Sequence, residues 1–175
     1  GSSLPFEENI ARTREVVSMA REAGVSVEAE LGSLATGLHS DEAGQAEVYT
    51  DPVLAFEFIK QTAVDALAIS IGTVHGMYRG EPKIALNVLR SIAGLVETPL
   101  VLHGGSGTPP EVLRECIGLG IAKINVNTEI SLAVVERLRQ ELAAGTMPNL
   151  PFLSRLQTQT VSEVAERYLR LLNAI

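Results

Sequence analysis

The sequence predicts an α/β fold in which parallel strands alternate with helices, and three observations support this prediction. Short runs of Val, Ile, Leu and Ala recur along the chain, as is typical of strands buried on both faces. Segments with the apolar period of a helix separate these runs. Polar residues and glycines follow several of the runs directly. Strand, loop and helix alternate four times, and this alternation requires a parallel sheet.

The N-terminal half of the chain begins with an amphipathic helix over residues 4–23. Pro5 lies near its first turn, and Phe6, Ile10, Val17 and Ala20 form one apolar stripe. A strand over 25–32 and a polar stretch to about residue 50 follow. We then expect a helix from Asp51 and Pro52 to Gln61, and a strand from Asp65 to Gly72 that leads to His75.

The C-terminal half continues the alternation. The predicted elements are a helix over 84–96, a strand over 100–103, a helix from Pro109 to about Leu119, a strand over 121–126 and a helix capped by Thr128. The last helix is expected to start at Thr160, because Glu163 completes a T-x-x-E capping box there, with Val164, Tyr168 and Leu171 facing inward.

The number of strands sets the predicted architecture. Four strands cannot close an eight-stranded barrel of about 250 residues, and the sequence starts with a helix. The predicted fold class is therefore α/β of the (β/α)8 TIM-barrel type, with this chain covering about the C-terminal half. We expect residues 1–175 to form a single domain, a partial barrel with C-terminal helices from about residue 128 onward.

Composition excludes several classes of protein. The 175 residues are 46% hydrophobic and 20% charged, which indicates a globular chain. A net charge of −7 argues against nucleic-acid and anionic-membrane surfaces. No apolar stretch approaches the roughly 20 residues that cross a bilayer. The single cysteine, Cys116, excludes an internal disulfide and suits a reducing compartment. We expect a cytoplasmic protein with Cys116 as a small buried apolar residue.

Two histidines are candidate metal ligands. His75 and His103 each end an apolar run, and a glycine follows each of them. Two imidazoles at neighbouring strand ends could share one metal ion, although catalytic zinc prefers three protein ligands. The alternative is a pair of core histidines hydrogen-bonded to backbone. His39 is expected to be an ordinary loop residue.

A glycine-rich segment after the second histidine is a candidate anion site. Its residues are Gly104, Gly105, Ser106 and Gly107. Their backbone N–H groups and the hydroxyl could form a nest for phosphate, and a helix starting at Pro109 would add positive potential. The alternative is an ordinary tight turn between strand and helix.

Further polar residues belong to the predicted mouth of the sheet. Asn125, Asn127 and Thr128 follow the last strand, although the latter two could simply cap the next helix. Asn125, placed inside an apolar strand, is expected to be buried and to need partners. Glu28 and Glu30 alternate along the first strand and share one face. Asp41 and Glu42 follow in a loop and are either solvated or a mobile acid/base.

Five segments together carry a resemblance to a known family. They are VEAELGSL (27–34), YTDP (49–52), DALAISIGTVHGMYRGEPKI (65–84), LVLHGGSGTP (100–109) and AKINVNTEI (122–130). The chain closely resembles the class II, metal-dependent fructose/tagatose-bisphosphate aldolases, whose fold is a (β/α)8 barrel. The resemblance implies reversible aldol cleavage of fructose- or tagatose-1,6-bisphosphate to dihydroxyacetone phosphate and glyceraldehyde 3-phosphate. A half-barrel exposes two sheet edges and its apolar interior, so we also expect a homo-oligomer, a dimer or tetramer.

The resemblance assigns roles to residues. It implies that His75, His103 and Glu30 lie at a catalytic Zn²⁺ or another divalent metal, with a possible monovalent cation nearby. The residues that match substrate or phosphate contacts in the family are Gly76, Arg79, Gly104, Gly105, Ser106, Asn125, Asn127 and Thr128. Asp41 or Glu42 matches the loop acid that exchanges a proton, and Asn125, which matches a substrate contact, is counted with them as a catalytic residue.

Three hypotheses follow. The first is an aldolase that works only when the earlier strands of the barrel are supplied, because the family's Asp-His pair, which provides the third zinc ligand, has no counterpart in this sequence. The second is a non-catalytic half-barrel fragment or assembly module. The third, a metal-free phosphate-binding barrel, explains the glycines but not the paired histidines.

Overall fold

The molecule is built on a parallel sheet. The computed structural model describes residues 1–40, 48–146 and 149–172. Four strands pair in the order β1-β3-β5-β6: β1 (Glu28–Leu31), β3 (Ala66–Ile69), β5 (Leu100–Leu102) and β6 (Ile121–Ile124). Every pairing is parallel. The predicted α/β alternation is therefore confirmed, with strands shorter than the sequence indicated.

A second, smaller sheet was not expected from the sequence. It pairs β2 (Ala35–Thr36) with β4 (Val74–His75), again in parallel. These two strands follow β1 and β3 along the chain, so they extend the same two segments beyond the main sheet. Thr50 joins the ends of the main strands, because its Oγ1 donates to the carbonyl of Leu31 at 2.5 Å and accepts from the N–H of Ser70 at 2.8 Å.

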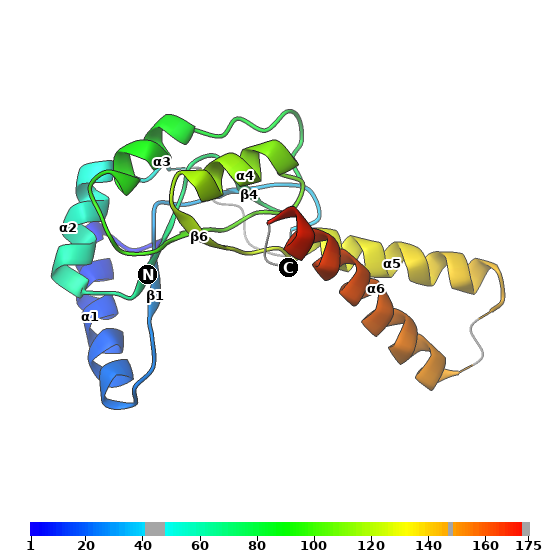
Figure 1. Cartoon of the computed structure of the whole chain (residues 1–175). Helices are drawn as coiled ribbons and strands as arrows, with labels where there is room; N and C mark the ends of the chain where they lie inside the picture. Colours follow the sequence, from blue (N-terminus) through cyan, green and yellow to red (C-terminus); the bar gives the residue numbers. More distant parts are fainter. Residues whose placement is uncertain (41–47, 147–148, 173–175) are drawn as a thin grey trace.

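Four helices cover the sheet, and all but the first connect its strands (Figure 1). They are α1 (Phe6–Glu22), α2 (Pro52–Thr62), α3 (Leu86–Ala93) and α4 (Pro110–Gly118). Asp51 caps α2 through hydrogen bonds from the N–H groups of Val53 and Leu54, and Pro52 occupies its first turn, as the sequence indicated. The apolar stripe of α1 is confirmed, since Ile10 and Val17 are buried.

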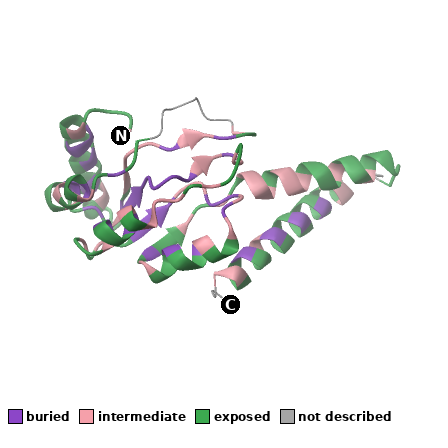
Figure 2. Cartoon of the chain, turned by 90° about the horizontal axis from the view of Figure 1, so that it is seen from above, coloured by how far each residue is buried: buried purple, intermediate pink, exposed green. Residues whose placement is uncertain are grey.

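The core lies between these helices and the sheet and is almost entirely aliphatic. Its fully buried side chains include Phe58 from α2, Leu67 and Ile69 from β3, and Leu102 from β5. Figure 2 shows the buried residues gathered on the central strands and on the inner faces of the helices. Cys116 belongs to this core and is completely buried, as predicted.

The last two helices form a hairpin that projects from the body of the molecule (Figure 1). They are α5 (Thr128–Ala143) and α6 (Leu150–Leu171), and they pack on each other. No residue of α5, all of which the structure describes, is buried. The apolar stripe of α6 faces inward as predicted, with Val164 and Tyr168 buried.

The start of α6 differs from the prediction. The helix begins ten residues before Thr160, and Asn149 holds its N-cap position, where the side chain accepts from the N–H of Phe152 at 3.0 Å. Thr160 lies in mid-helix, and its hydroxyl donates to the carbonyl of Leu156 at 2.8 Å. The proposed capping box at Thr160 and Glu163 is therefore wrong, because a T-x-x-E pattern also fits a helix interior whose threonine bonds to the preceding turn.

Candidate active site

The carboxyl ends of the strands surround a cavity of about 700 Å³. Its walls come from β1, β4, the segment after β5 and the segment after β6. The lining residues are Glu30, Ser40, His75, Gly76, His103, Gly104, Ser106, Ile124, Asn125, Val126, Asn127 and Thr128. Nine of the predicted site residues thus meet in one place, as expected for polar residues at the same end of a parallel sheet.

The two candidate ligand histidines face each other across this cavity. His75 ends β4, and His103 follows β5 directly. Their ring centroids are 6.2 Å apart, with the ring planes inclined by 30°. Both residues are only partly exposed. Neither histidine is fully buried, and each lines the cavity.

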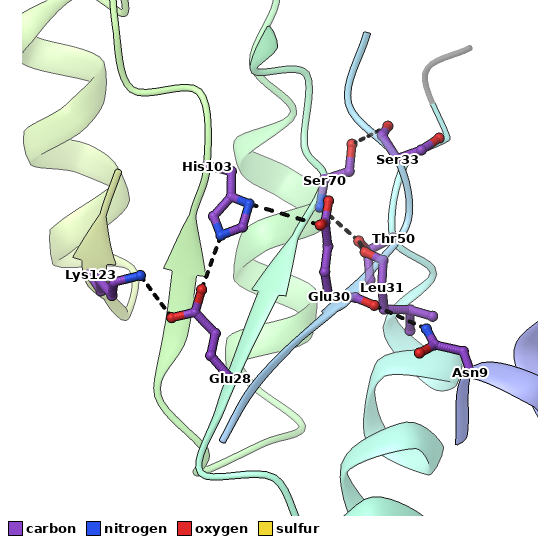
Figure 3. A network of polar contacts seen from close by, with 9 residues as sticks. All are labelled: Asn9, Glu28, Glu30, Leu31, Ser33, Thr50, Ser70, His103 and Lys123. Atoms are coloured by element: carbon purple, nitrogen blue, oxygen red, sulfur yellow. Dashed lines mark hydrogen bonds and ion pairs between the residues drawn. The ribbon is translucent and has the colours of Figure 1, made fainter. Parts of the chain in front are cut away.

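Two carboxylates from β1 reach the same histidine (Figure 3). His103 Nε2 lies 3.1 Å from Glu28 Oε1, and His103 Nδ1 lies 3.9 Å from Glu30 Oε2. The predicted common face of Glu28 and Glu30 is confirmed. When Nε2 carries the ring proton, it donates to Glu28 and leaves the lone pair of Nδ1 for a metal ion.

Lys123 completes this polar cluster. Its Nζ lies 2.8 Å from Glu28 Oε2. Burial opposes ionisation of Glu28, but hydrogen bonds from Lys123 and His103 outweigh that effect and hold the pKa of this carboxyl below its usual value. Glu28 is therefore the ionised anchor of the His103 ring. Lys123 was not predicted as a site residue, although a lysine inside an apolar strand was a visible signal.

The two histidines and Glu30 fit a zinc ion in their chemistry, and the two rings come close to the spacing that a shared ion requires. Two imidazoles and a carboxylate are ligands that catalytic zinc takes in proteins. Two imidazoles on one tetrahedral ion would have ring centroids roughly 5–6 Å apart, given Zn–N bonds of about 2.0 Å. The observed 6.2 Å needs only a small adjustment. Among the residues that the structure describes, however, no group of three His, Cys, Asp or Glu side chains converges closely enough to hold a metal.

Glycines allow backbone segments to pack tightly beside the histidines. Gly104 has φ +69°, and a Cβ there would lie 2.3 Å from the carbonyl oxygen of Val74. Gly76 has φ +109°, and a Cβ there would lie 2.4 Å from the carbonyl oxygen of Leu38. Any side chain would push these segments apart, so glycine is required at both positions.

The rest of the glycine-rich segment is held by neighbouring backbone. Gly105 is buried, and its N–H donates to the carbonyl of Asn125 at 2.9 Å, so it supports the cavity without lining it. Ser106 is 3% exposed, lines the cavity and accepts from the N–H of Glu129 at 3.2 Å. The helix whose N-terminus reaches the cavity is α5, through Asn127 and Thr128; among the described lining residues none comes from α4, to which the sequence analysis had assigned this role.

The polar residues after β6 differ in detail from the prediction. Asn125 follows the end of the strand and is exposed, so its expected burial is wrong. Asn127, and not Thr128, holds the N-cap position of α5, and its side chain makes no capping hydrogen bond. Instead its Oδ1 accepts from the hydroxyl of Ser131 at 3.4 Å. Helix capping therefore does not explain why the side chains of Asn125 and Asn127 are placed at the cavity.

Besides Gly105, three predicted site residues are not placed in the cavity. Arg79 is exposed and is not among the described residues that line it. Asp41 and Glu42 lie outside the described residues. Ser40, which precedes them, does line the cavity, and His39 is an exposed loop residue as expected.

Comparison with protein families gives a match over the whole chain. The model of the class-II fructose-bisphosphate aldolase family matches residues 1–175. The chain belongs to this family. The resemblance seen in the sequence motifs is thereby confirmed.

Individual relatives agree with this assignment. The chain is 47% identical over 142 residues to a fructose-bisphosphate aldolase of Geobacillus stearothermophilus, covering 81% of this chain and 49% of the relative. It is 44% identical over 143 residues to a probable fructose-bisphosphate aldolase of Bacillus subtilis, covering 82% and 50%. The chain thus spans about half the length of the curated relatives it matches.

Solved structures of aldolases share the fold. The YdjI aldolase of Escherichia coli K12 superposes with a TM-score of 0.79 at 34% identity, covering 98% of this chain and 57% of that one. A putative fructose-1,6-biphosphate aldolase of Coccidioides immitis gives a TM-score of 0.87 at 29% identity, covering 98% and 60%. The predicted partial barrel is consistent with these coverages.

Proposed function

We propose that this chain provides the metal- and phosphate-binding side of a class II ketose-bisphosphate aldolase site. The reaction would be reversible cleavage of fructose- or tagatose-1,6-bisphosphate to dihydroxyacetone phosphate and glyceraldehyde 3-phosphate. One observation carries this proposal: the cavity that holds both ligand-type histidines also holds Gly104 and Ser106 of the glycine-rich segment. A metal-free phosphate site would not need two imidazoles facing each other at 6.2 Å.

Zinc is the proposed metal. His75, His103 and Glu30 would hold it, and bound there it would supply a Lewis acid that polarises the ketose carbonyl. Glu28 serves this centre indirectly, because it fixes the orientation of the His103 ring. Lys123 in turn keeps Glu28 ionised and in place.

Phosphate binding is proposed for the part of the cavity formed by Ser106 and the start of α5. Ser106 offers a hydroxyl there, and the first turn of α5 adds the positive end of a helix dipole next to Thr128. Asn125 and Asn127 are placed to hydrogen-bond the hydroxyl groups of the sugar chain. We assign proton exchange to Asp41 or Glu42 in the segment after Ser40, and an accessory phosphate contact to Arg79.

A second candidate function is a half-barrel that does not catalyse the reaction by itself. It is favoured by the lack of any three-ligand metal group among the described residues. The two candidates differ in whether this chain alone binds zinc stoichiometrically. They agree on the fold and on the cavity.

The deciding experiment measures zinc stoichiometry and affinity by calorimetry on the 175-residue chain, followed by aldol cleavage coupled to NADH oxidation. Wild type is compared with the His75→Ala/His103→Ala double variant. The control is His39→Asn, which removes the third histidine from an exposed position and tolerates its φ of +59°. Stoichiometric zinc that is lost only in the double variant supports the aldolase site. Absence of specific zinc binding in wild type would mean that the earlier strands of the barrel are essential and that this chain does not catalyse the reaction by itself.

A further inference from the structure

We propose that Glu129, Arg167 and Tyr168 are positioning residues through which the projecting helix α6 holds the anion-binding segment 104–107. The inference deepens the proposed function, since it rests on the phosphate role of that segment. Arg167 and Tyr168 are not among the described residues that line the cavity, so any effect they have on ligand binding must act through other residues.

Glu129 connects α5 to the glycine-rich segment by two hydrogen bonds. Its backbone N–H donates to Ser106 Oγ at 3.2 Å, and its Oε2 accepts from the N–H of Gly107 at 3.4 Å. The first bond occupies a lone pair of the Ser106 hydroxyl and leaves its proton to be donated elsewhere. Glu129 thereby helps to set the orientation in which Ser106 faces the cavity.

The carboxylate of Glu129 also receives two donors from α6. Arg167 pairs with Oε1, and the hydroxyl of Tyr168 donates to Oε2. These residues lie 38 and 39 positions further along the chain, so the contacts join two ends of the C-terminal hairpin to the loop after β5. Tyr168 is 9% exposed. Its burial and its bond to Glu129 raise its pKa well above the usual value, so it remains a donor at all physiological pH values.

Electrostatics predicts the direction of the effect. A free carboxylate beside an anion site repels the anion. The guanidinium of Arg167 neutralises this charge, and the Tyr168 hydroxyl fixes the carboxylate oxygen that bonds to Gly107. Removal of either donor from α6 should therefore weaken binding of a phosphorylated ligand, although neither Arg167 nor Tyr168 lines the cavity.

The experiment measures the dissociation constant of dihydroxyacetone phosphate, and of inorganic phosphate, for the 175-residue chain in Tyr168→Phe and Arg167→Met. The matched control is Arg170→Met, which removes the same charge from α6. Arg170 pairs instead with Glu166 on the same helix, where both side chains are exposed. Hydrogen exchange of the Gly107 amide in the ligand-free chain is measured in parallel.

We expect roughly 3- to 10-fold weaker binding in both test variants, the size of one typical net hydrogen bond, with faster exchange at Gly107 and no change in Arg170→Met. Unchanged binding in both test variants, or an equal loss in Arg170→Met, would overturn the inference alone. Failure of wild type to bind either ligand would overturn the proposed phosphate site. The Gly107 exchange would then still decide the coupling, and unchanged exchange in Tyr168→Phe would overturn it.

Discussion

Substitution of Gly104 by alanine tests how tightly the segments around the cavity are packed. Gly104 and Gly24 have nearly the same backbone angle, with φ +69° and +67°. A Cβ at Gly24 would meet nothing within 4 Å, whereas a Cβ at Gly104 would lie 2.3 Å from the Val74 carbonyl oxygen. The pair therefore separates the cost of the left-handed backbone from the cost of the clash.

The expected magnitudes follow from these two terms. The left-handed conformation costs an alanine about 1–2 kcal/mol, and this cost applies to Gly24→Ala and Gly104→Ala alike. The clash is with backbone, which cannot rotate away, so we expect an overpacking penalty of roughly 1–3 kcal/mol in addition at Gly104. The effect on the unfolded chain is the same for both variants and cancels.

Urea unfolding followed by circular dichroism measures both free energies of unfolding. Gly104→Ala should be less stable than Gly24→Ala by roughly 1–3 kcal/mol. It should also bind dihydroxyacetone phosphate more weakly, because the clash displaces the segment next to His103. Equal loss of stability in the two variants would refute the close approach of Gly104 to Val74.

Three further predictions concern the framework, and urea unfolding checks each. Phe58→Ala should cost about 3–5 kcal/mol of stability because the ring is fully buried. Phe56→Ala, on the exposed face of the same helix, should cost about 0.5 kcal/mol or less. Similar costs in the two variants would contradict the described packing of α2. Asn149→Ala should cost about 1 kcal/mol of stability because it removes the N-cap of α6. Thr160→Ala should cost less than half of that, since Thr160 caps nothing. The reverse order would indicate that the helix starts at Thr160. Burial raises the pKa of the Cys116 thiol from 9.0 to about 11. Its contribution to the free energy of unfolding is therefore fully present below pH 9 and is lost as the pH rises toward 11. Cys116→Ala should lose less stability than wild type over that pH range, and an equally steep loss would argue against a buried thiol.

The order of strands and helices was predictable because its signals are local. Apolar runs and helical periodicity lie within a few neighbouring residues, so α1, α2 and the four strands of the main sheet were expected within a few positions. His75 and His103 were predicted for the same reason, since each ends an apolar run in front of a glycine. Their meeting in one cavity follows from the parallel sheet.

Other features depend on contacts between distant segments. The β2–β4 pair has only two residues in each strand and forms because β1 and β3 have already aligned. The start of α6 was missed because the pattern at Thr160 suits a helix interior equally well. Lys123 and Glu129 lie within the segment AKINVNTEI (122–130), but no local pattern assigned either of them a role, because their partners lie 95 and up to 39 positions away.

The ion pair between Glu28 and Lys123 joins the two edge strands of the four-stranded sheet, since the strand order is β1-β3-β5-β6. In a flat sheet these edges would lie about 14 Å apart, and side chains standing perpendicular to it would point in parallel directions. A contact of 2.8 Å therefore requires the sheet to bend toward its polar face. The curvature that a closed barrel needs is already present in these four strands, and the separation of Glu28 and Lys123 is a direct gauge of it.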